Sequence, residues 1–471
     1  MSESSSIETL AAILRAEIAR LAPGDRLPSS RDLIVRHGVG PVTVARAIAL
    51  LAAEGVVVTR PGSGTYVAPR RPRPTADAPD MSWQAVALAG RDSDTGGSDG
   101  TSETLPDGVI AMAGGYLHES LQPTRALGAA LARAARRPDA WHRAPTAGLA
   151  PLRAIFARLA GGAVGPEDVL VTGGAQGALS TLFRAIAPPG GPVLVESPTY
   201  PGALAAARAA GLRPVPVPVD DDGIRPDLLA DAFAMTGARL MYCQPTVHNP
   251  TGAMLSPGRR RQIVDVARAA GAFLIEDDFA RHLGHGAPLP RALVADDRDG
   301  TVVNLTSLTK PASPSLRIGA VIARGPVMRR LQAMRLVDDF FIARPLQEAA
   351  VELLSTPAWD RHLRTLGGAL RERCATLADA LAHEVPDWTL TRLPAGGLHL
   401  WLQLPSGSAD SAVAAAARAH GVAVDAGARY YPAEPQGSYL RVGFAAAADL
   451  SELTAAASRL GAVAREAGRH R

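Results

Sequence analysis

The sequence predicts an α/β protein that carries a small separate N-terminal domain, and three observations support this fold class. Residues 1–68 have the pattern of three short helices followed by a β-hairpin. Residues 69–108 are rich in Pro, Gly, Ser, Asp and Thr, which is typical of a linker. From residue 109 to residue 471, short apolar runs alternate with helical stretches, and this alternation predicts a largely parallel sheet covered by helices. The predicted strands are the runs DVLVTGG, PVLVESP, RPVPVPVD, RLMYCQP, AFLIEDD and TVVNLTS.

Length and composition indicate a large buried core. The chain has 471 residues, which is enough for about three domain-sized units, and 47% of them are hydrophobic, which is enough for a large core. The N-terminal apolar pattern contains charged residues, and no run of ~18 uncharged apolar residues follows, so we expect no signal peptide, no membrane span and a cytoplasmic location. With only Cys243 and Cys374, a disulfide framework and a cysteine-rich zinc site are excluded. We interpret both as core thiols and expect no metal.

Each element of the N-terminal domain has its own sequence signal. A helical stripe of apolar residues covers residues 7–21 and is stopped by the stretch APGD. A second short helix begins with Ser29 or Ser30 as its N-cap, and a third has Pro41 in its first turn. Two β-branched runs around PGSG predict a hairpin over residues 56–67. Three helices with a tight second turn and a terminal hairpin are typical of a winged helix-turn-helix.

The positive charge is concentrated in this domain. Residues 1–73 hold ten Arg against six acidic residues, whereas the rest of the chain is balanced, so the first segment carries the whole net charge of +4. Such asymmetry favours a polyanion as the partner of this segment. The excess is modest, and many domains with no polyanion partner match it.

The N-terminal domain resembles the DNA-binding domain of the GntR superfamily over its whole length, through three stretches: GDRLPSSRDL, VTVARAIALLAAEG and RPGSGTYV. The resemblance implies that the third helix enters the major groove of double-stranded DNA, where Thr43 and Arg46 reach phosphates or bases. It implies further contacts from the second helix and the hairpin, by Ser30, Arg31, Arg60 and Gly64, where close approach to the DNA backbone needs a small residue. Gly40-Pro41 stands where the family usually has Ser-Arg, so one expected Arg contact is absent, which affects affinity or operator sequence.

Lys310 is the only lysine of the chain, since the other 48 Lys or Arg positions are Arg. A Schiff base with an aldehyde needs a primary amine that can lose its proton, and a guanidinium cannot replace it. Lys310 is therefore a candidate Schiff-base nucleophile. The alternative is a surface lysine kept by chance.

Polar side chains follow the predicted strands of the α/β part. Ligands of such sheets lie beyond the carboxyl ends of the strands. The sequence places there a helix N-terminus suited to phosphate, an aromatic ring, an amide, a carboxylate and the lysine: Gly174, Ala175 and Gln176, Tyr200, Asn249, Asp277, and Ser307, Thr309 and Lys310 followed by Arg317. Pyridoxal phosphate requires this combination of groups. Each residue alone also fits a structural role, such as a tight turn, a helix cap, a salt bridge or a core aromatic.

From about residue 110 to the end, the chain resembles the fold-type I aminotransferases, through the motifs VTGGAQGAL, ESPTYPGAL, QPTVHNPTG, LIEDDFARHL, SLTKPASPSLRIG and YLRVGFA. The resemblance implies a large domain with a mainly parallel sheet and a small α+β subdomain from about residue 345 to residue 471. It also implies that pyridoxal 5'-phosphate is the cofactor and that Lys310 forms the Schiff base with it.

The same resemblance implies a role for each site residue. Asp277 pairs with the ring nitrogen, Asn249 donates to the phenolic oxygen, and Tyr200 stacks on the ring. The phosphate is held by Gly174, Ala175, Gln176, Ser307, Thr309 and Arg317. Arg441 clamps the carboxylate of a substrate or effector; its alternative is an ordinary strand salt bridge. Phe279 stands where the family commonly has a Tyr that binds the phenolic oxygen, so imine exchange is expected to be slower.

Taken together, the chain resembles the MocR subfamily of transcriptional regulators, which implies a head-to-tail homodimer that binds an operator and senses a small amino compound or pyridoxal phosphate. We expect a regulator with no turnover in vivo. One alternative is a working pyridoxal-phosphate-dependent aminotransferase with an accessory winged helix. Another is a winged helix that binds protein, joined to an inactive scaffold.

Overall fold

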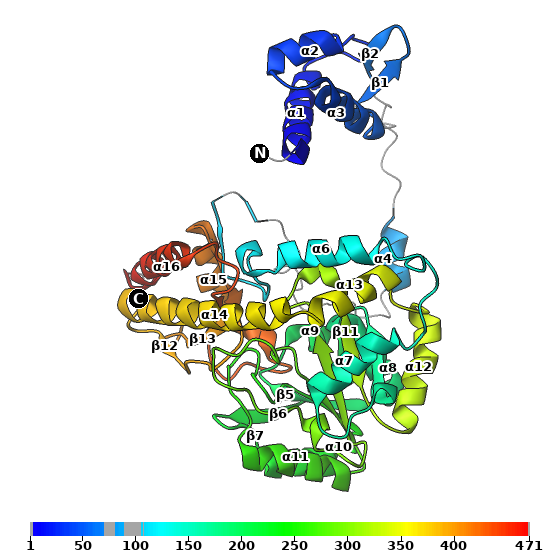
Figure 1. Ribbon diagram of the computed structural model, residues 1–471. Helices are drawn as coiled ribbons and strands as arrows, with labels where there is room; N and C mark the ends of the chain where they lie inside the picture. Colours follow the sequence, from blue (N-terminus) through cyan, green and yellow to red (C-terminus); the bar gives the residue numbers. More distant parts are fainter. Residues whose placement is uncertain (1–2, 70–80, 89–104, 107, 470–471) are drawn as a thin grey trace. The chain divides into compact units, whose positions relative to one another are not determined.

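The computed structural model describes residues 3–69, 81–88, 105–106 and 108–469 (Figure 1). The chain divides into two compact units, residues 1–90 and 91–471. Most of the expected linker at 69–108 lies outside the described residues; within it, Ser82–Leu88 forms the helix α4. The two units are described separately below.

The first unit contains the three expected helices and the hairpin: α1 Glu3–Ile18, α2 Ser30–His37, α3 Pro41–Ala53, β1 Val57–Arg60 and β2 Gly64–Val67. The chain bends by 114° between α2 and α3, which is the geometry of a helix-turn-helix. One apolar core joins all five elements, with buried side chains that include Leu10, Leu14, Leu33, Val44, Leu51, Val57 and Val67. The prediction of a winged helix-turn-helix is confirmed.

The start of α2 decides between the two candidate caps. Ser29 is the N-cap, since its hydroxyl accepts from the backbone N–H of Asp32 at 3.3 Å and the Asp32 carboxylate accepts from the N–H of Ser29 at 3.1 Å. Ser30 is instead the first residue of the helix and is exposed. Gly38, at φ 62°, ends the helix in the left-handed conformation.

The second unit is built on an eight-stranded sheet in the order β4-β11-β10-β9-β8-β5-β6-β7. Six strands match the predicted apolar runs: β4 Val169–Thr172, β5 Pro192–Ser197, β6 Arg213–Asp220, β8 Leu240–Cys243, β9 Phe273–Asp277 and β10 Val302–Ser307. Two more were not predicted: β7 Gly223–Ile224 and β11 Gly319–Ile322. The sheet is mainly parallel, but β11 runs antiparallel to both β10 and β4, and β7 antiparallel to β6.

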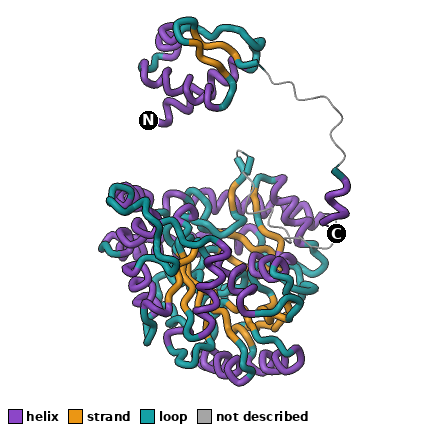
Figure 2. Tube along the Cα trace, turned by 90° about the vertical axis from the view of Figure 1, so that its right-hand side faces the viewer, coloured by secondary structure: helices purple, strands orange, loops and turns teal. Residues whose placement is uncertain are grey.

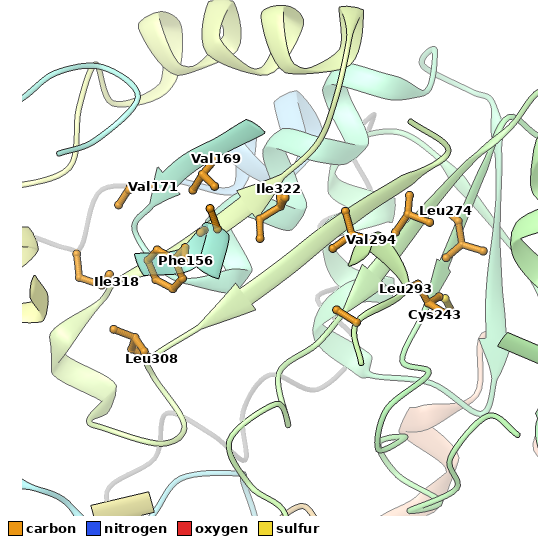
Figure 3. Close-up of a cluster of buried hydrophobic side chains, with 14 of the residues drawn as sticks. Phe156, Val169, Val171, Cys243, Leu274, Leu293, Val294, Leu308, Ile318 and Ile322 are labelled. Atoms are coloured by element: carbon orange, nitrogen blue, oxygen red, sulfur yellow. The ribbon is translucent and has the colours of Figure 1, made fainter. Parts of the chain in front are cut away.

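Helices cover both faces of this sheet, as Figure 2 shows, where the strands lie between helices. One face packs against α7 Ala150–Ala160, α10 Pro226–Thr236, α11 Pro257–Ala269 and α13 Arg344–Leu354. The other packs against α8 Ala175–Ile186, α9 Pro201–Ala209 and α12 Pro326–Asp338. Figure 3 shows the first of these cores, around Phe156. Successive residues of one strand enter opposite cores, so the strands read as continuous apolar runs.

The remaining elements form a smaller domain with a sheet in the order β12-β13-β16-β15. Its elements are α14 Pro357–Glu384, β12 Thr389–Leu390, β13 His399–Gln403, α15 Asp410–Ala419, β14 Val422–Ala423, β15 Asp425–Ala426, β16 Tyr439–Gly443 and α16 Leu450–Arg469. The strand β3 Ile110–Ala111 pairs with β14, so the start of the unit belongs to this domain. The helix α6 Thr124–Ala134 follows and packs on α13.

Both cysteines are free and buried, in agreement with their interpretation as core thiols. Within the described ranges, no single helix is long and apolar enough to cross a membrane, although α2 and α3 pass as a bent pair by length and composition alone.

Candidate functional site

A cavity of about 420 Å³ lies where the strand ends of the large sheet face the smaller domain. It brings together nearly all the site residues predicted in this unit: Ala175, Gln176, Tyr200, Asn249, Asp277, Ser307, Thr309, Lys310, Arg317 and Arg441. Gly174 lies beside them, against Arg317. Sequence reasoning missed Gly114, Gly115, Tyr116, His399, Asp425, Arg429 and Tyr430, which also line the cavity. These come from the segment after β3 and from the smaller domain, and no strand-end signal marks them.

Lys310 presents its amine inside the cavity. Its Nζ lies 4.0 Å from the centre of the Tyr116 ring, and a Cβ added to Gly115 would stand 3.4 Å from it. Burial, followed by the charge of Arg441, lowers the pKa of Lys310 to about 8. A useful fraction of the amine is therefore neutral and nucleophilic near pH 7. The lysine is thus not one left on the outer surface.

Asp277 carries a buried oxygen that lacks a partner. The hydroxyl of Tyr242 donates to Oδ2 of Asp277 at 2.7 Å. Oδ1 has no hydrogen-bond partner among the described residues, although it is fully buried. Burial raises the pKa of Asp277 to about 6, and the bond from Tyr242 opposes that rise. A cationic N–H in the cavity would satisfy Oδ1, and a protonated pyridine nitrogen fits this need.

Tyr242 was not predicted as a site residue. It lies on β8 with its ring in the core that packs on α8, and a tyrosine within a buried strand has the pattern of a core residue. The sequence therefore offered no signal for its bond to Asp277.

Backbone donors and hydroxyls also line the cavity, around the start of α8. The helix α8 begins at Ala175, so the first N–H groups of the helix have no partner within it. The Nη2 of Arg317 donates to the Gly173 carbonyl at 2.7 Å, and a Cβ on Gly174 would stand 2.8 Å from that nitrogen. Gly174 is at φ 92°, so a side chain there is excluded by both strain and contact. The group fits a phosphate.

The side chains at positions 307, 309 and 176 line the same cavity. The hydroxyl of Ser307 donates to that of Thr309 at 3.0 Å and accepts from the Thr309 N–H at 3.1 Å. The amide of Gln176 donates to the Gly202 carbonyl at 2.7 Å and accepts from the Tyr200 hydroxyl at 3.1 Å. The Gln176 side chain is therefore engaged with the protein, so only its backbone N–H could serve the predicted phosphate.

Asn249, Tyr200 and Phe279 also line the cavity. The Oδ1 of Asn249 accepts from Nη1 of Arg441 at 3.1 Å, so the N–H groups of the Asn249 amide point away from Arg441. Burial raises the pKa of Tyr200 to about 12, so this residue is a neutral ring with a hydroxyl fixed by Gln176. Phe279 brings no hydroxyl, as expected from the sequence.

Arg441 forms a buried ion pair with Asp425. The Oδ2 of Asp425 lies 2.6 Å from Nη2 and 3.1 Å from Nε of Arg441. The two residues face each other across β15 and β16. The structure therefore contains the strand salt bridge that was the alternative interpretation of Arg441, and it does so within the cavity wall.

The predicted DNA-binding residues lie on the first unit. Arg46 is exposed on α3, Thr43 is half-buried near its start, and Ser30 and Arg31 are exposed at the start of α2. Arg60, at the end of β1, stacks on Tyr66 with its guanidinium carbon 4.9 Å from the ring centre.

Gly64 has an internal reason for being glycine. Its φ is 122°, and an added Cβ would lie 2.9 Å from Nε of Arg26. Its lack of a side chain is therefore explained within the domain, whereas the prediction attributed it to close approach of DNA. A contact from its backbone to DNA stays a prediction.

Two family models match the chain. Aminotransferase class I and II covers residues 112–460, and the gntR family of bacterial regulatory proteins covers residues 6–67. Similar proteins include the uncharacterized HTH-type transcriptional regulator YdcR of Escherichia coli, which is 32% identical over 92% of this chain and 94% of its own length. The 2-aminoadipate transaminase of Thermus thermophilus is also 32% identical, over 64% of this chain and 77% of its own.

Solved structures agree with this pattern. The α-aminoadipate aminotransferase LysN from Thermus thermophilus, complexed with N-(5'-phosphopyridoxyl)-L-leucine, is 28% identical with a TM-score of 0.73 and covers 80% of this chain and 98% of its own. The kynurenine aminotransferase of Pyrococcus horikoshii shares the fold at 24% identity, with a TM-score of 0.72, over 77% of this chain and 92% of its own.

Proposed function

Because the chain belongs to the MocR-type regulators, which join a GntR-family domain to an aminotransferase class I and II domain, we propose that it is a DNA-binding transcription regulator that senses pyridoxal phosphate or a small amino compound. One observation carries this proposal: a single cavity combines the lone lysine, the unpaired oxygen of Asp277 and the donors around Arg317. An operator on DNA places its action in the cytoplasm.

The cavity residues fit pyridoxal phosphate as the bound group. When bound, it supplies an aldehyde that forms a carbon–nitrogen double bond with a primary amine, and a ring that withdraws electrons. Lys310 offers the amine, and Oδ1 of Asp277 accepts from the ring nitrogen. Asn249 donates to the phenolic oxygen, and Tyr200 stacks on the ring. The phosphate is held by Gly174, Ala175, Gln176, Ser307, Thr309 and Arg317.

The phosphate contact of Arg317 can be tested with two ligands that differ only in the phosphate. We expect Arg317→Gln to weaken binding of pyridoxal phosphate about 10- to 150-fold, since a hydrogen bond to a charged group contributes about 1.5–3 kcal/mol. Binding of pyridoxal, which lacks the phosphate, should change less than about twofold. Fluorescence titration of the unloaded protein measures both constants. Equal losses for the two ligands would mean that Arg317 acts on the fold of the site and not on the phosphate.

The expected homodimer is supported by an exposed apolar patch on the second unit. The patch comprises Trp141, Leu336, Val337 and Phe340, of which Trp141 and Val337 are 78% and 77% exposed. Its two segments are tied together, since Arg344 pairs with Asp139 and Arg143 lies over the ring of Phe341. A monomer would leave these large side chains in water. A dimer that covers them also presents two DNA-binding domains to two half-sites, in the head-to-tail arrangement expected from the family.

The regulator proposal requires DNA binding that depends on the ligand. An effector shifts DNA affinity only by the difference in its own affinity for the two states of the protein. Fluorescence anisotropy of the full chain, with DNA from upstream of its gene, tests this with and without pyridoxal phosphate and amines. We expect steep weakening by salt and a shift of affinity on loading. DNA binding that is absent at low salt would favour a winged helix that binds protein.

The helix α3, which is expected to enter the major groove, leads to a separate prediction. Arg46→Gln should lower DNA affinity about tenfold and reduce the slope of log affinity against log salt by about one, because one phosphate or base contact is lost. Arg20→Gln is the matched control, since it removes the same charge from an exposed position of the same domain, beyond the end of α1. If both variants lose affinity equally, the effect is one of net charge and α3 does not read the DNA.

Transaminase activity is the second candidate, because a 2-aminoadipate transaminase is among the 32%-identical relatives. Phe279 argues for slow exchange at the cavity, since the phenolic oxygen lacks one donor. Incubation with amino acids and 2-oxo acids decides between the two functions. Many turnovers per chain would favour the enzyme, and a single turnover or none would favour the sensor.

A further inference from the structure

The guanidinium of Arg441 already holds a carboxylate that belongs to the protein. Asp425 is 4% exposed and Arg441 is 6% exposed. Arg441 directs Nε–H and one N–H of Nη2 at Oδ2 of Asp425, at 3.1 and 2.6 Å. Its other Nη2 hydrogen meets the Gly114 carbonyl at 2.6 Å, and Nη1 donates to Asn249 at 3.1 Å.

This arrangement leaves too few donors for a second carboxylate. A guanidinium has five N–H groups, and four of those of Arg441 are used. One N–H of Nη1 remains without a partner in the part of the chain that the structure describes. Strong binding of a carboxylate by arginine needs two parallel N–H bonds to its two oxygens. An incoming carboxylate can therefore form this bidentate pair with Arg441 only if Asp425 is displaced.

Asp425 is also held from other sides. Its Oδ1 lies 3.2 Å from Nη1 of Arg429, and its Oδ2 accepts from the hydroxyl of Tyr430 at 3.2 Å and from the Gly114 N–H at 3.3 Å. Burial would raise the pKa of Asp425, but the charges of Arg441 and Arg429 outweigh it and hold the pKa below its usual value. Asp425 is thus a carboxylate at neutral pH, and a second carboxylate beside it meets like-charge repulsion.

Arg429 weakens the pairing of Asp425 with Arg441 and so favours binding of a second carboxylate. It lies in the short 3-10 helix η5 Gly427–Tyr430, and its side chain is 20% exposed and lines the cavity. Asp425 is paired with both Arg429 and Arg441, so Arg429 partly neutralises the carboxylate and weakens its hold on Arg441. The cavity wall thus contains one carboxylate between two guanidinium groups.

We propose that Asp425 occupies the carboxylate place on Arg441, so that the site selects a primary amine without a carboxylate on the amine-bearing carbon over an α-amino acid. This inference rests on the proposed cofactor site at Lys310. It replaces the expectation that Arg441 clamps the carboxylate of the effector, and it makes Asp425 and Arg429 the residues that set the effector class.

The test uses two ligands that differ in the carboxylate alone, L-leucine and 3-methylbutylamine. The full chain, loaded with pyridoxal phosphate, is titrated with each, and binding is followed by the cofactor's absorbance and by calorimetry. The quantity of interest is the ratio of the two dissociation constants. Comparing this ratio between variants cancels the difference in basicity of the two amines, because that difference is the same for every variant.

Two variants should move the ratio in opposite directions. Asp425→Asn removes the charge that pairs with Arg441. It should therefore lower the dissociation constant of L-leucine at least about tenfold and change that of 3-methylbutylamine less than about threefold. Arg429→Gln leaves Arg441 as the one guanidinium paired with Asp425 in the described site. It should weaken binding of L-leucine about threefold or more, again with little change in binding of 3-methylbutylamine. A merely structural role would weaken both ligands in both variants. Thermal melting and retained cofactor absorbance show that each variant is folded.

Two results would overturn the proposal. One is a wild-type chain that binds L-leucine about tenfold more tightly than the amine, as a free arginine clamp would. The other is an Asp425→Asn chain that loses affinity for both ligands, which would make Asp425 a residue that positions Arg441 for a carboxylate. The wild-type ratio and Arg429→Gln decide the matter even if Asp425→Asn fails to fold. If the wild-type chain shows no cofactor absorbance at all, the cofactor site itself is wrong, and this outcome is separate from any change of the ratio.

Discussion

Lys310→Ala is expected to carry no pyridoxyl group after loading with pyridoxal phosphate and reduction with borohydride, whereas the wild-type chain should carry about one per chain. Reduction converts a carbon–nitrogen double bond into a stable single bond, so the label marks the amine that formed it. No other lysine competes for the label, because the sequence contains only one. Mass spectrometry of the digested protein measures the result on the peptide that contains residue 310.

Lys310→Arg separates the amine from its charge. Arginine retains a cation in the cavity but cannot lose its proton to attack an aldehyde. Both variants should therefore lose the label completely, and the effector-dependent shift of DNA affinity should vanish with it. Because Arg317 and the α8 N-terminus do not involve the lysine, some non-covalent binding of the cofactor should survive. A label of wild-type size on either variant would contradict the assignment, as would normal effector response in both.

Most strands of the large sheet could be predicted because they are buried on both faces; β6, which is half-exposed, is the exception. Val171 faces one core and Leu170 the other, so the run around them is apolar at every position. The strand β11 was missed because Gly319–Ile322 follows closely on the loop after Lys310 and returns antiparallel within the sheet. Only its pairing with β4 and β10 reveals it, and that pairing depends on residues far apart in the sequence.

The predicted site residues follow from local sequence pattern, whereas the missed ones depend on pairing between distant parts of the chain. Asp277 and Ser307 end adjacent strands of one sheet, so topology alone brings them together. Asp425 reaches the cavity through the pairing of β15 with β16, and Tyr116 through the strand β3 that joins the smaller domain. These contacts depend on how two domains face each other. No periodic pattern encodes that arrangement.

The role of Asp277 leads to the second large effect. Asp277→Asn is expected to weaken binding of pyridoxal phosphate about 30-fold or more, since loss of one partner of a buried charge pair costs about 2–5 kcal/mol. Asparagine has the same shape, so packing around the site is retained. Tyr242→Phe is the matched control: it removes the bond to Oδ2 and leaves the carboxylate in place. Its expected effect is about 1 kcal/mol, or about fivefold. Fluorescence titration near pH 7.5 gives both values, and similar losses in the two variants would mean that the carboxylate charge is not what the cofactor requires.

Acidification should remove the advantage of the wild-type chain over Asp277→Asn. Since burial raises the pKa of Asp277 to about 6, the carboxylate that pairs with the ring nitrogen is present at pH 7.5 and is largely protonated at pH 5. The difference in binding between the two chains should therefore shrink as the pH falls through about 6. Titrating groups that do not interact with Asp277 affect both chains equally and cancel in this difference. A difference that stays constant from pH 7.5 to pH 5 would exclude Asp277 as the ionised partner.

The stability of the unloaded protein should respond to the same carboxylate with the opposite sign. The folded-state pKa of Asp277, about 6, lies above its ordinary value of 3.8, so between these values the folded chain binds more protons than the unfolded chain. The contribution of this group to the free energy of unfolding therefore rises as the pH falls from 7 towards 4. Asp277→Asn lacks this contribution, so its stability should exceed that of the wild type near pH 7 and lose that advantage on acidification. A buried carboxylate that destabilises the empty protein and strengthens its complex is the expected result when a cationic ligand completes the site.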